Sequence, residues 1–225
     1  MSSTAFSPTP TTDRPWVHEM VIIHRAFRRE LTILPRLVRE VDDGDTQRAA
    51  TLAGAVRLVL AGLHHHHTGE DVILWPALLE RAAPSTGLVE TMQAQHEAVE
   101  GHMEQVEPLL RAWEDAPTPA RGAELADLLD RLAAALIEHL DLEEREILPL
   151  AERHVTVAEW NSLGDQGVEE MDQKQLPIIF GAILEECTPE ERRAMLAKLP
   201  LPVRLLIRTA GAVQYRRFVS RVRGR

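Results

Sequence analysis

Two short segments of the sequence decide the fold: HHTGEDVILWP at residues 66–76 and HLDLEEREILP at residues 139–149. Each begins with a histidine, has a glutamate four residues later, and ends with a proline six residues after the glutamate. In a helix, residues four apart lie on one face. Each segment therefore predicts a helix that places an imidazole beside a carboxylate.

The two segments belong to an internal repeat. His24 precedes His66 by 42 residues and His96 precedes His139 by 43, so each segment has a partner histidine about the same distance upstream. Two helical hairpins related by a pseudo-twofold axis would place such residues symmetrically about the bundle axis. This symmetry favours a centre with two metal ions.

Apolar residues recur with a 3,4 alternation in four segments, which predicts helices that pack at a shallow angle. Breakers separate the segments at residues 42–45, 84–87 and 117–119. We predict an all-α fold, an up-down-up-down four-helix bundle over residues 16–154. A proline ten to twelve residues after each inward histidine is expected to kink or end the helix: Pro35, Pro76, Pro108 and Pro149. Each segment thus has a stripe of residues expected to face inward. In the second segment this stripe continues from Glu70 to Ile73. In the fourth it continues from Glu143 to Glu146, with Ile147 beside it.

Histidines and glutamates interrupt these otherwise apolar stripes. An unpaired ionised group in a core costs several kcal/mol, so something must compensate. Neutral imidazole and carboxylate suit iron, manganese or zinc. We expect the two carboxylates to bridge two metal ions, which would also share a solvent bridge. Each ion would bind two histidines, and one coordination position would remain open for a small molecule. The predicted metal ligands are His24, His66, Glu70, His96, His139 and Glu143.

The run of four histidines at 64–67 leaves an alternative open. Consecutive helical residues are 100° apart, so the four cannot share one ion. Only His66 falls in both the stripe and the repeat, with His65 or His67 as the alternative ligand; His64 and His67 are otherwise expected to be solvated or to support the ligands. A shift of phase by one residue would turn Asp71 and Glu144 inward, which the stripe disfavours.

The order of one histidine, HxxxE, one histidine and HxxxE resembles the hemerythrin-like HHE cation-binding domain family, from roughly Trp16 to His154. The resemblance implies a non-haem di-iron centre (Fe2+/Fe3+) with an oxo, hydroxo or water bridge, held by the six ligands named above. The oxygen-carrying hemerythrins have a second histidine one turn after the first on the third helix. Here Glu100 stands at that offset, which makes it a candidate further ligand and favours turnover of oxygen or peroxide over reversible oxygen carriage.

These features lead to three functional hypotheses. The first is a di-iron protein that binds or reduces dioxygen, peroxide or nitric oxide, with catalase-like, peroxidase or other oxidoreductase activity left open. The second is a redox- or iron-responsive sensor acting through the C-terminal helices, and the third is a metal-scavenging protein. A net charge of -10 argues against a general nucleic-acid binder. The single cysteine excludes an intramolecular disulfide framework. With no transmembrane stretch, we expect a cytoplasmic protein.

The two ends of the chain differ from the bundle. Residues 1–15, rich in Ser, Thr and Pro, are predicted to be a disordered lead-in. Residues 155–225 are predicted to be a helical extension packed on the bundle or its mouth, with a homodimer interface as the alternative. Capping boxes would open helices at Thr156 and Thr188. Seven arginines and no acid between Val203 and Arg225 would contact an acidic partner, anionic lipid or nucleic acid, or pair with the protein's own acidic surface.

Overall fold

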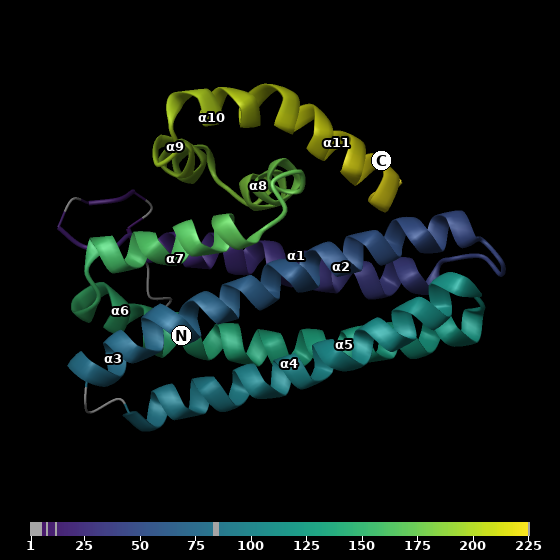
Figure 1. The fold of residues 1–225 in the computed structure, drawn as a ribbon, viewed down its shortest axis with the longest axis horizontal. Coiled ribbons are helices and arrows are strands. Elements are labelled where there is room, and N and C mark those ends of the chain that lie inside the picture. The colour runs from purple at the N-terminus through teal and green to yellow at the C-terminus, as the bar shows by residue number, and fades with distance from the viewer. Residues whose placement is uncertain (1–5, 8, 12, 83–85, 225) are drawn as a thin grey trace.

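The computed structural model describes residues 6–7, 9–11, 13–82 and 86–224, and the regular elements in this part of the chain are all helical. Four long helical segments form a closed bundle in which α1 contacts α2 and α5, and α4 contacts the same two helices (Figure 1). Helices next to one another in the chain are therefore neighbours in space, which confirms the predicted four-helix bundle. Its elements are α1 (His18–Arg39), α2 (Thr46–Gly69), η1 (Glu70–Leu74), α3 (Trp75–Arg81), α4 (Thr86–Asp115), α5 (Pro119–Leu142), η3 (Glu143–Ile147) and α6 (Leu148–His154).

The second and fourth segments each contain a π-helical turn, η1 and η3, which begins at the glutamate of the HxxxE motif. The N–H of Trp75 bonds to the carbonyl of Glu70, and the N–H of Leu148 bonds to the carbonyl of Glu143. The prolines Pro76 and Pro149, which have no N–H to donate, come next. The sequence predicted a kink at this point, and the structure resolves it as a widened turn.

The widened turns shift the buried stripe by one residue. The sequence pattern expected Ile73, and Glu146 with Ile147 beside it, to face inward. The structure fully buries Leu74 and Ile147, while the Glu146 side chain is 48% exposed. A π-helical turn holds one more residue than an α-helical turn, so positions beyond it rotate around the axis. The expectation was therefore wrong for Ile73 and Glu146 and correct for Ile147.

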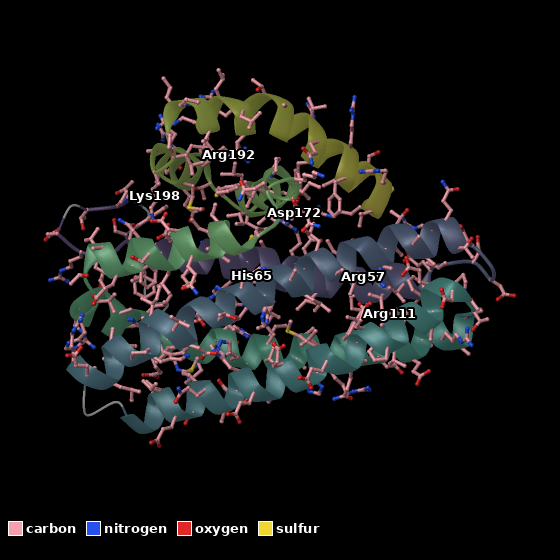
Figure 2. The ribbon with its side chains drawn as sticks, in the orientation of Figure 1. Arg57, His65, Arg111, Asp172, Arg192 and Lys198 are labelled. Atoms are coloured by element: carbon pink, nitrogen blue, oxygen red, sulfur yellow. The ribbon has the colours of Figure 1, made fainter. Side chains whose placement is uncertain are left out.

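Side-chain caps start the helices where the sequence breaks. Asp45 accepts a hydrogen bond from the N–H of Arg48 at the start of α2 (2.9 Å), and Thr118 accepts one from Arg121 at the start of α5. On the outer surface, Arg57 of α2 donates to the carboxylate of Glu107 and so joins α2 to α4, and Arg111, one turn after Glu107 on α4, donates to the same carboxylate; both arginines are labelled in Figure 2.

The bundle core consists of two apolar clusters. One lies around Leu34, Leu63 and Leu129, towards the loops that join α1 to α2 and α4 to α5. The other lies around Leu74, Trp75 and other residues near α3 and α6. The histidines and glutamates of the four stripes lie in the sequence segments between these clusters, so they are buried in mid-bundle.

The C-terminal extension covers one side of the bundle. In Figure 1, α7 lies across α1 and α2, and the remaining helices stack beyond it. The main contacts of α7 are with α2 and η1, and those of α8 are with α1, α11 and η4. The predicted capping boxes at Thr156 and Thr188 are both present. The elements are α7 (Val157–Glu170), α8 (Leu176–Glu185), α9 (Pro189–Ala197), α10 (Leu201–Leu206), η4 (Ile207–Gly211) and α11 (Ala212–Arg223).

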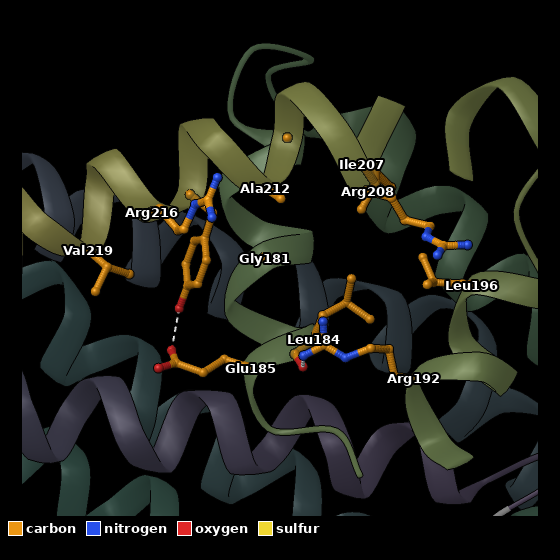
Figure 3. A pocket seen from close by; sticks show the side chains of 12 residues that line it. Gly181, Leu184, Glu185, Arg192, Leu196, Ile207, Arg208, Ala212, Arg216 and Val219 are labelled. Carbon is orange, nitrogen blue, oxygen red and sulfur yellow. Dashed lines mark hydrogen bonds between the residues drawn. The ribbon is translucent and has the colours of Figure 1, made fainter. Parts of the chain in front are cut away.

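Contacts within the extension hold its last helix in place. Gly181 of α8 allows the ring of Tyr215 to lie against the helix backbone, and the Tyr215 hydroxyl donates to Glu185 (Figure 3). Arg223, near the end of α11, pairs with Glu185 and with Glu30 of α1. At least one arginine of the basic tail thus pairs with the protein's own acidic residues.

None of the described helices is both long enough and apolar enough to cross a membrane. The predicted lead-in at residues 1–15 falls partly on positions 1–5, 8 and 12, which lie outside the described residues. In its described part, the carbonyl of Ser7 accepts a hydrogen bond from Trp16 Nε1 at 2.9 Å. The disorder of this segment stays a prediction.

Candidate metal centre

The structure brings the six predicted ligands together in the middle of the bundle. Each long helix contributes one histidine, and each π-helical turn contributes its first residue. Four of the six side chains have no exposed surface, and the other two are nearly buried. In chain order they are His24 (α1), His66 (α2), Glu70 (η1), His96 (α4), His139 (α5) and Glu143 (η3).

The histidines form two pairs, one from each hairpin. The Nε2 atoms of His24 and His66 are 3.2 Å apart, and those of His96 and His139 are also 3.2 Å apart. The sequence repeat predicted two equivalent hairpins, and the pairing follows it. Each pair therefore offers two nitrogen donors close enough together to bind one metal ion.

The two glutamates lie between the pairs. Glu70 has Oε1 3.3 Å from Nε2 of His66 and Oε2 3.2 Å from Nε2 of His96. Glu143 has Oε2 3.2 Å from Nε2 of His24 and 3.9 Å from Nε2 of His139. Each carboxylate thus reaches one histidine of each pair, which is the position that a bridging ligand requires.

The chemistry of this donor set fits a metal. All four carboxylate oxygens of Glu70 and Glu143 are buried, and none has a hydrogen-bond partner among the described residues. The imidazole nitrogens lie close to them but are not oriented to donate. An unpaired carboxylate in a core is strongly unfavourable, and a cation at this point would satisfy it. One donor atom from each of His24, His66, Glu70 and Glu143 lies within 4.8 Å of all the others.

Two further carboxylates lie beside the outer nitrogens of two of the predicted ligands, His24 and His96. Glu144 Oε1 lies 2.9 Å from Nδ1 of His24, and Asp71 Oδ1 lies 2.9 Å from Nδ1 of His96. Arg28 donates to Glu144 at 2.6 Å. The residue after Glu70 and the residue after Glu143 therefore each orient a histidine on another helix. The alternative in which Asp71 and Glu144 turn inward is wrong, because the stripe before the π-helical turn keeps Glu70 and Glu143 on the core side.

The pKa values of the residues in the cluster are shifted in opposite directions. Burial opposes the charged forms of His24 and His96, but neighbouring acids outweigh it. Glu143 and Glu144 raise the pKa of His24 to about 9. Asp71 and Glu70 raise the pKa of His96 to about 9. Burial lowers the pKa of His139 to about 3. Burial, reinforced by Glu143, raises the pKa of the Glu70 carboxyl. Some of these groups hold protons at neutral pH, and a cation must displace them.

His67 lies in the core beside the predicted ligands. The sequence left it open as an alternative ligand to His66 or as a solvated or supporting residue; it is only 4% exposed, which excludes the solvated position, and its ring stacks on His96 with centroids 4.0 Å apart. Both of its ring nitrogens are buried, with no hydrogen-bond partner among the described residues. The reason is the position of α2 between α1 and α4. His66 faces α1, and the next residue, rotated by 100°, faces α4.

Glu100, the candidate further ligand, lies outside the cluster. Its side chain is 42% exposed, and Oε2 is 3.5 Å from Nδ1 of the half-exposed His64. Although Glu100 follows His96 by one helical turn, its carboxylate lies beside the exposed His64 of α2 and outside the buried cluster. The candidate Glu100 therefore does not join the six predicted ligands.

Fold and site together define an all-helical four-helix bundle with a buried cluster of histidines and glutamates suited to cations. The family model for the Hemerythrin HHE cation binding domain matches residues 17–151. The chain belongs to this family, which confirms the resemblance seen in the sequence. No curated protein and no solved structure matches the chain. Residues 152–225, which include the whole C-terminal extension, lie beyond the matched range.

Proposed function

We propose that this protein is a non-haem di-iron protein that binds or reduces a small oxidant. The observation that carries the proposal is the placement of Glu70 and Glu143, each of which reaches one histidine of both pairs. When bound, a pair of iron ions would supply electrons to, or a coordination site for, dioxygen, peroxide or nitric oxide. Manganese and zinc share this preference for imidazole and carboxylate.

The chain's own residues would prepare the site. Asp71 and Glu144 fix the ring orientation of His96 and His24, so the Nε2 atoms point at the centre before any ion arrives. The apolar clusters on either side limit the access of water. We assign no residue as a general acid or base.

A cavity supports the access of a small molecule. It has a volume of about 590 Å³, lies between the bundle and the C-terminal extension, and reaches His66 and Glu70. Its walls are largely apolar and include Phe27, Val59 and Leu163. An uncharged oxidant would cross such a space readily, whereas ions would not.

The test is metal loading followed by reaction. The purified protein is loaded anaerobically with ferrous iron, and the iron content is measured. Dioxygen, peroxide and nitric oxide are then added in separate experiments, and the loss of each oxidant and the optical spectrum are followed. His96→Ala is expected to abolish both iron retention and peroxide turnover. His64→Ala, at a histidine of α2 whose side chain is 55% exposed, is the control and is expected to behave as the wild type. Wild-type protein that holds two irons and reacts with none of the three oxidants would contradict the proposal.

A second candidate function, an iron or redox sensor, is favoured by the packing of α7. A Cβ placed on Gly69 would lie only 3.7 Å from Leu163 of α7, so α7 rests directly beside Glu70. A shift of Glu70 on metal binding would thus press on the extension. The arginine-rich C-terminal segment would then contact an acidic partner. The exposed side chains of Leu201, Leu205 and Leu206 would add an apolar surface to this contact. Limited tryptic cleavage at Arg204 and beyond, compared with and without iron, tests this, and equal protection in both states would argue against it.

A further inference from the structure

We propose that a pocket in the C-terminal extension binds a small organic anion with an apolar tail, of the kind represented by a medium-chain fatty acid carboxylate. The pocket has a volume of about 690 Å³ and lies between α8, α9 and the segment formed by η4 and α11 (Figure 3). It lies beyond the residues that match the family, and none of the six predicted metal ligands lines it. The inference therefore goes beyond the proposed function and does not depend on it.

The buried side of this pocket is apolar. Leu184 of α8, Leu196 of α9 and Ile207 of η4 line it, and each is less than a tenth exposed. The three side chains belong to one small apolar cluster of the extension. Pockets that take small organic ligands have volumes of about 300–1,000 Å³ and mostly apolar walls. This pocket therefore has the size and the floor that a hydrocarbon tail requires.

The exposed side of the pocket is cationic. Arg192 of α9, Arg208 of η4 and Arg216 of α11 line it, and all three residues are exposed. Arg192 donates a hydrogen bond to the carbonyl of Leu184, which holds its guanidinium beside the apolar floor. Arg208 and Arg216 form no ion pair and no hydrogen bond with any described residue. Their charges are thus available to a ligand.

The acids of α8 and α9 do not neutralise these arginines. Glu185 lines the pocket, but its carboxylate accepts from the Tyr215 hydroxyl and pairs with Arg29 and Arg223. The remaining acids near it also have partners of their own: Glu186 pairs with Arg29, Glu190 with Arg193 and Glu191 with Arg25. The pocket therefore carries an excess of positive charge, although the whole chain has a net charge of -10.

Charge and shape together select the class of ligand. A carboxylate at the exposed side would bind arginine through paired N–H···O hydrogen bonds. A hydrocarbon tail would cover the apolar floor and so leave water, which is favourable in proportion to the area buried. The exposed Leu201, Leu205 and Leu206 do not line this pocket, so it is distinct from the surface that they form.

The test measures the binding of dodecanoate to the full chain by isothermal titration calorimetry, below the concentration at which dodecanoate forms micelles. We expect one site per wild-type chain. The double variant Arg208→Gln/Arg216→Gln should bind at least about tenfold more weakly, because it loses charge-assisted hydrogen bonds. Arg217→Gln, at the exposed residue next to Arg216 but outside the pocket lining, is the matched control and should bind as the wild type.

A second variant and a second ligand test the apolar part of the site. Ala212→Phe places a ring in the pocket and should also weaken the binding of dodecanoate. Acetate, which has the carboxylate without the tail, should bind at least about 100-fold more weakly than dodecanoate, because each buried methylene group contributes to affinity. Circular dichroism confirms the helical fold of each variant.

Four outcomes would overturn the inference. The first is no binding of dodecanoate to the wild type, and the second is acetate that binds as tightly as dodecanoate. The third is wild-type affinity in the double variant, which would place dodecanoate elsewhere, such as the cavity beside His66. The fourth is binding to vesicles of anionic lipid or to a polyglutamate peptide without binding to monomeric dodecanoate, which would assign the arginines to an open surface.

Discussion

The carboxylate of Asp71 lies 2.9 Å from Nδ1 of His96, on the side of the ring that faces away from the centre. Asp71 also accepts a hydrogen bond from the buried indole of Trp75 at 2.8 Å, so it is held from two directions. In the other half of the repeat, the carboxylate of Glu144 likewise lies 2.9 Å from Nδ1 of His24. The acidic pair in each HxxxE segment therefore supplies one group that faces the centre and one that orients a histidine on another helix.

Asp71→Asn is expected to lower iron affinity by about 10- to 100-fold, because the amide cannot fix the His96 ring as a carboxylate does. Glu144→Gln should act in the same way through His24. Chelator competition measures the effect. Glu146→Gln, at an exposed acid of the same segment, is the control. Wild-type affinity in both Asp71→Asn and Glu144→Gln would show that these contacts do not orient the ligands.

Metal binding is expected to stabilise the fold, because the buried carboxylates lack partners among the described residues without it. At a free iron concentration about 100 times the dissociation constant, the gain is about 2.7 kcal/mol. For a chain of this size that corresponds to a rise of roughly 5–10 °C in the unfolding temperature. Thermal unfolding with ferrous iron and with a chelator measures it. An unfolding temperature that is the same with and without bound iron would contradict the placement of the ions in this core.

Phe27 is expected to control access to the centre. Its ring lies 5.4 Å from the His66 ring, centroid to centroid, and lines the cavity. Phe27→Leu should speed the reaction of the iron-loaded protein with peroxide or nitric oxide a few-fold, and Phe27→Trp should slow it, with iron content unchanged. Stopped-flow absorbance measures these rates. Phe180→Leu alters the same cavity from α8 and is the control. Equal rates in all variants would mean that the oxidant enters elsewhere.

Gly181→Ala is expected to destabilise the protein by about 1–3 kcal/mol, because the new Cβ would overlap the ring of Tyr215. Gly54→Ala is the control, since a Cβ on this exposed helical glycine meets nothing within 4 Å, and should stabilise by about 0.5–1 kcal/mol. Urea unfolding measures both. In a Tyr215→Ala background the effect of Gly181→Ala should shrink. An undiminished effect there would remove the Tyr215 overlap as its cause.

Acid is expected to loosen the extension through Glu191. Burial opposes its ionisation, but hydrogen bonds from His18, the N–H of Thr188 and Arg25 lower its pKa from 4.5 to about 2. A folded-state pKa below the unfolded value gives stability that is complete above about pH 4.5 and is lost as the pH falls towards 2. The contribution is about 2 kcal/mol at neutral pH. Glu191→Gln should therefore flatten the dependence of unfolding free energy on pH in this window. A wild-type slope in that variant would assign the acid sensitivity to other groups.

The sequence by itself determined the bundle and the approximate site. Helical periodicity is local, so residues such as His24 and His139 could be placed on inward faces from spacing alone. The repeat then paired the hairpins. In the structure the six predicted ligands do lie together; their assignment as ligands stays a prediction for the metal-binding experiments to test.

Tertiary structure decided what local spacing could not. The extra residue in each π-helical turn buried Leu74 in place of Ile73, and buried Ile147 but left Glu146 exposed, since a widened turn resets the phase of everything beyond it. The burial of His67 likewise depended on α2 having neighbours on two sides. A helix's own period states which residues share a face, but only its packing partners determine how many of its faces are interior.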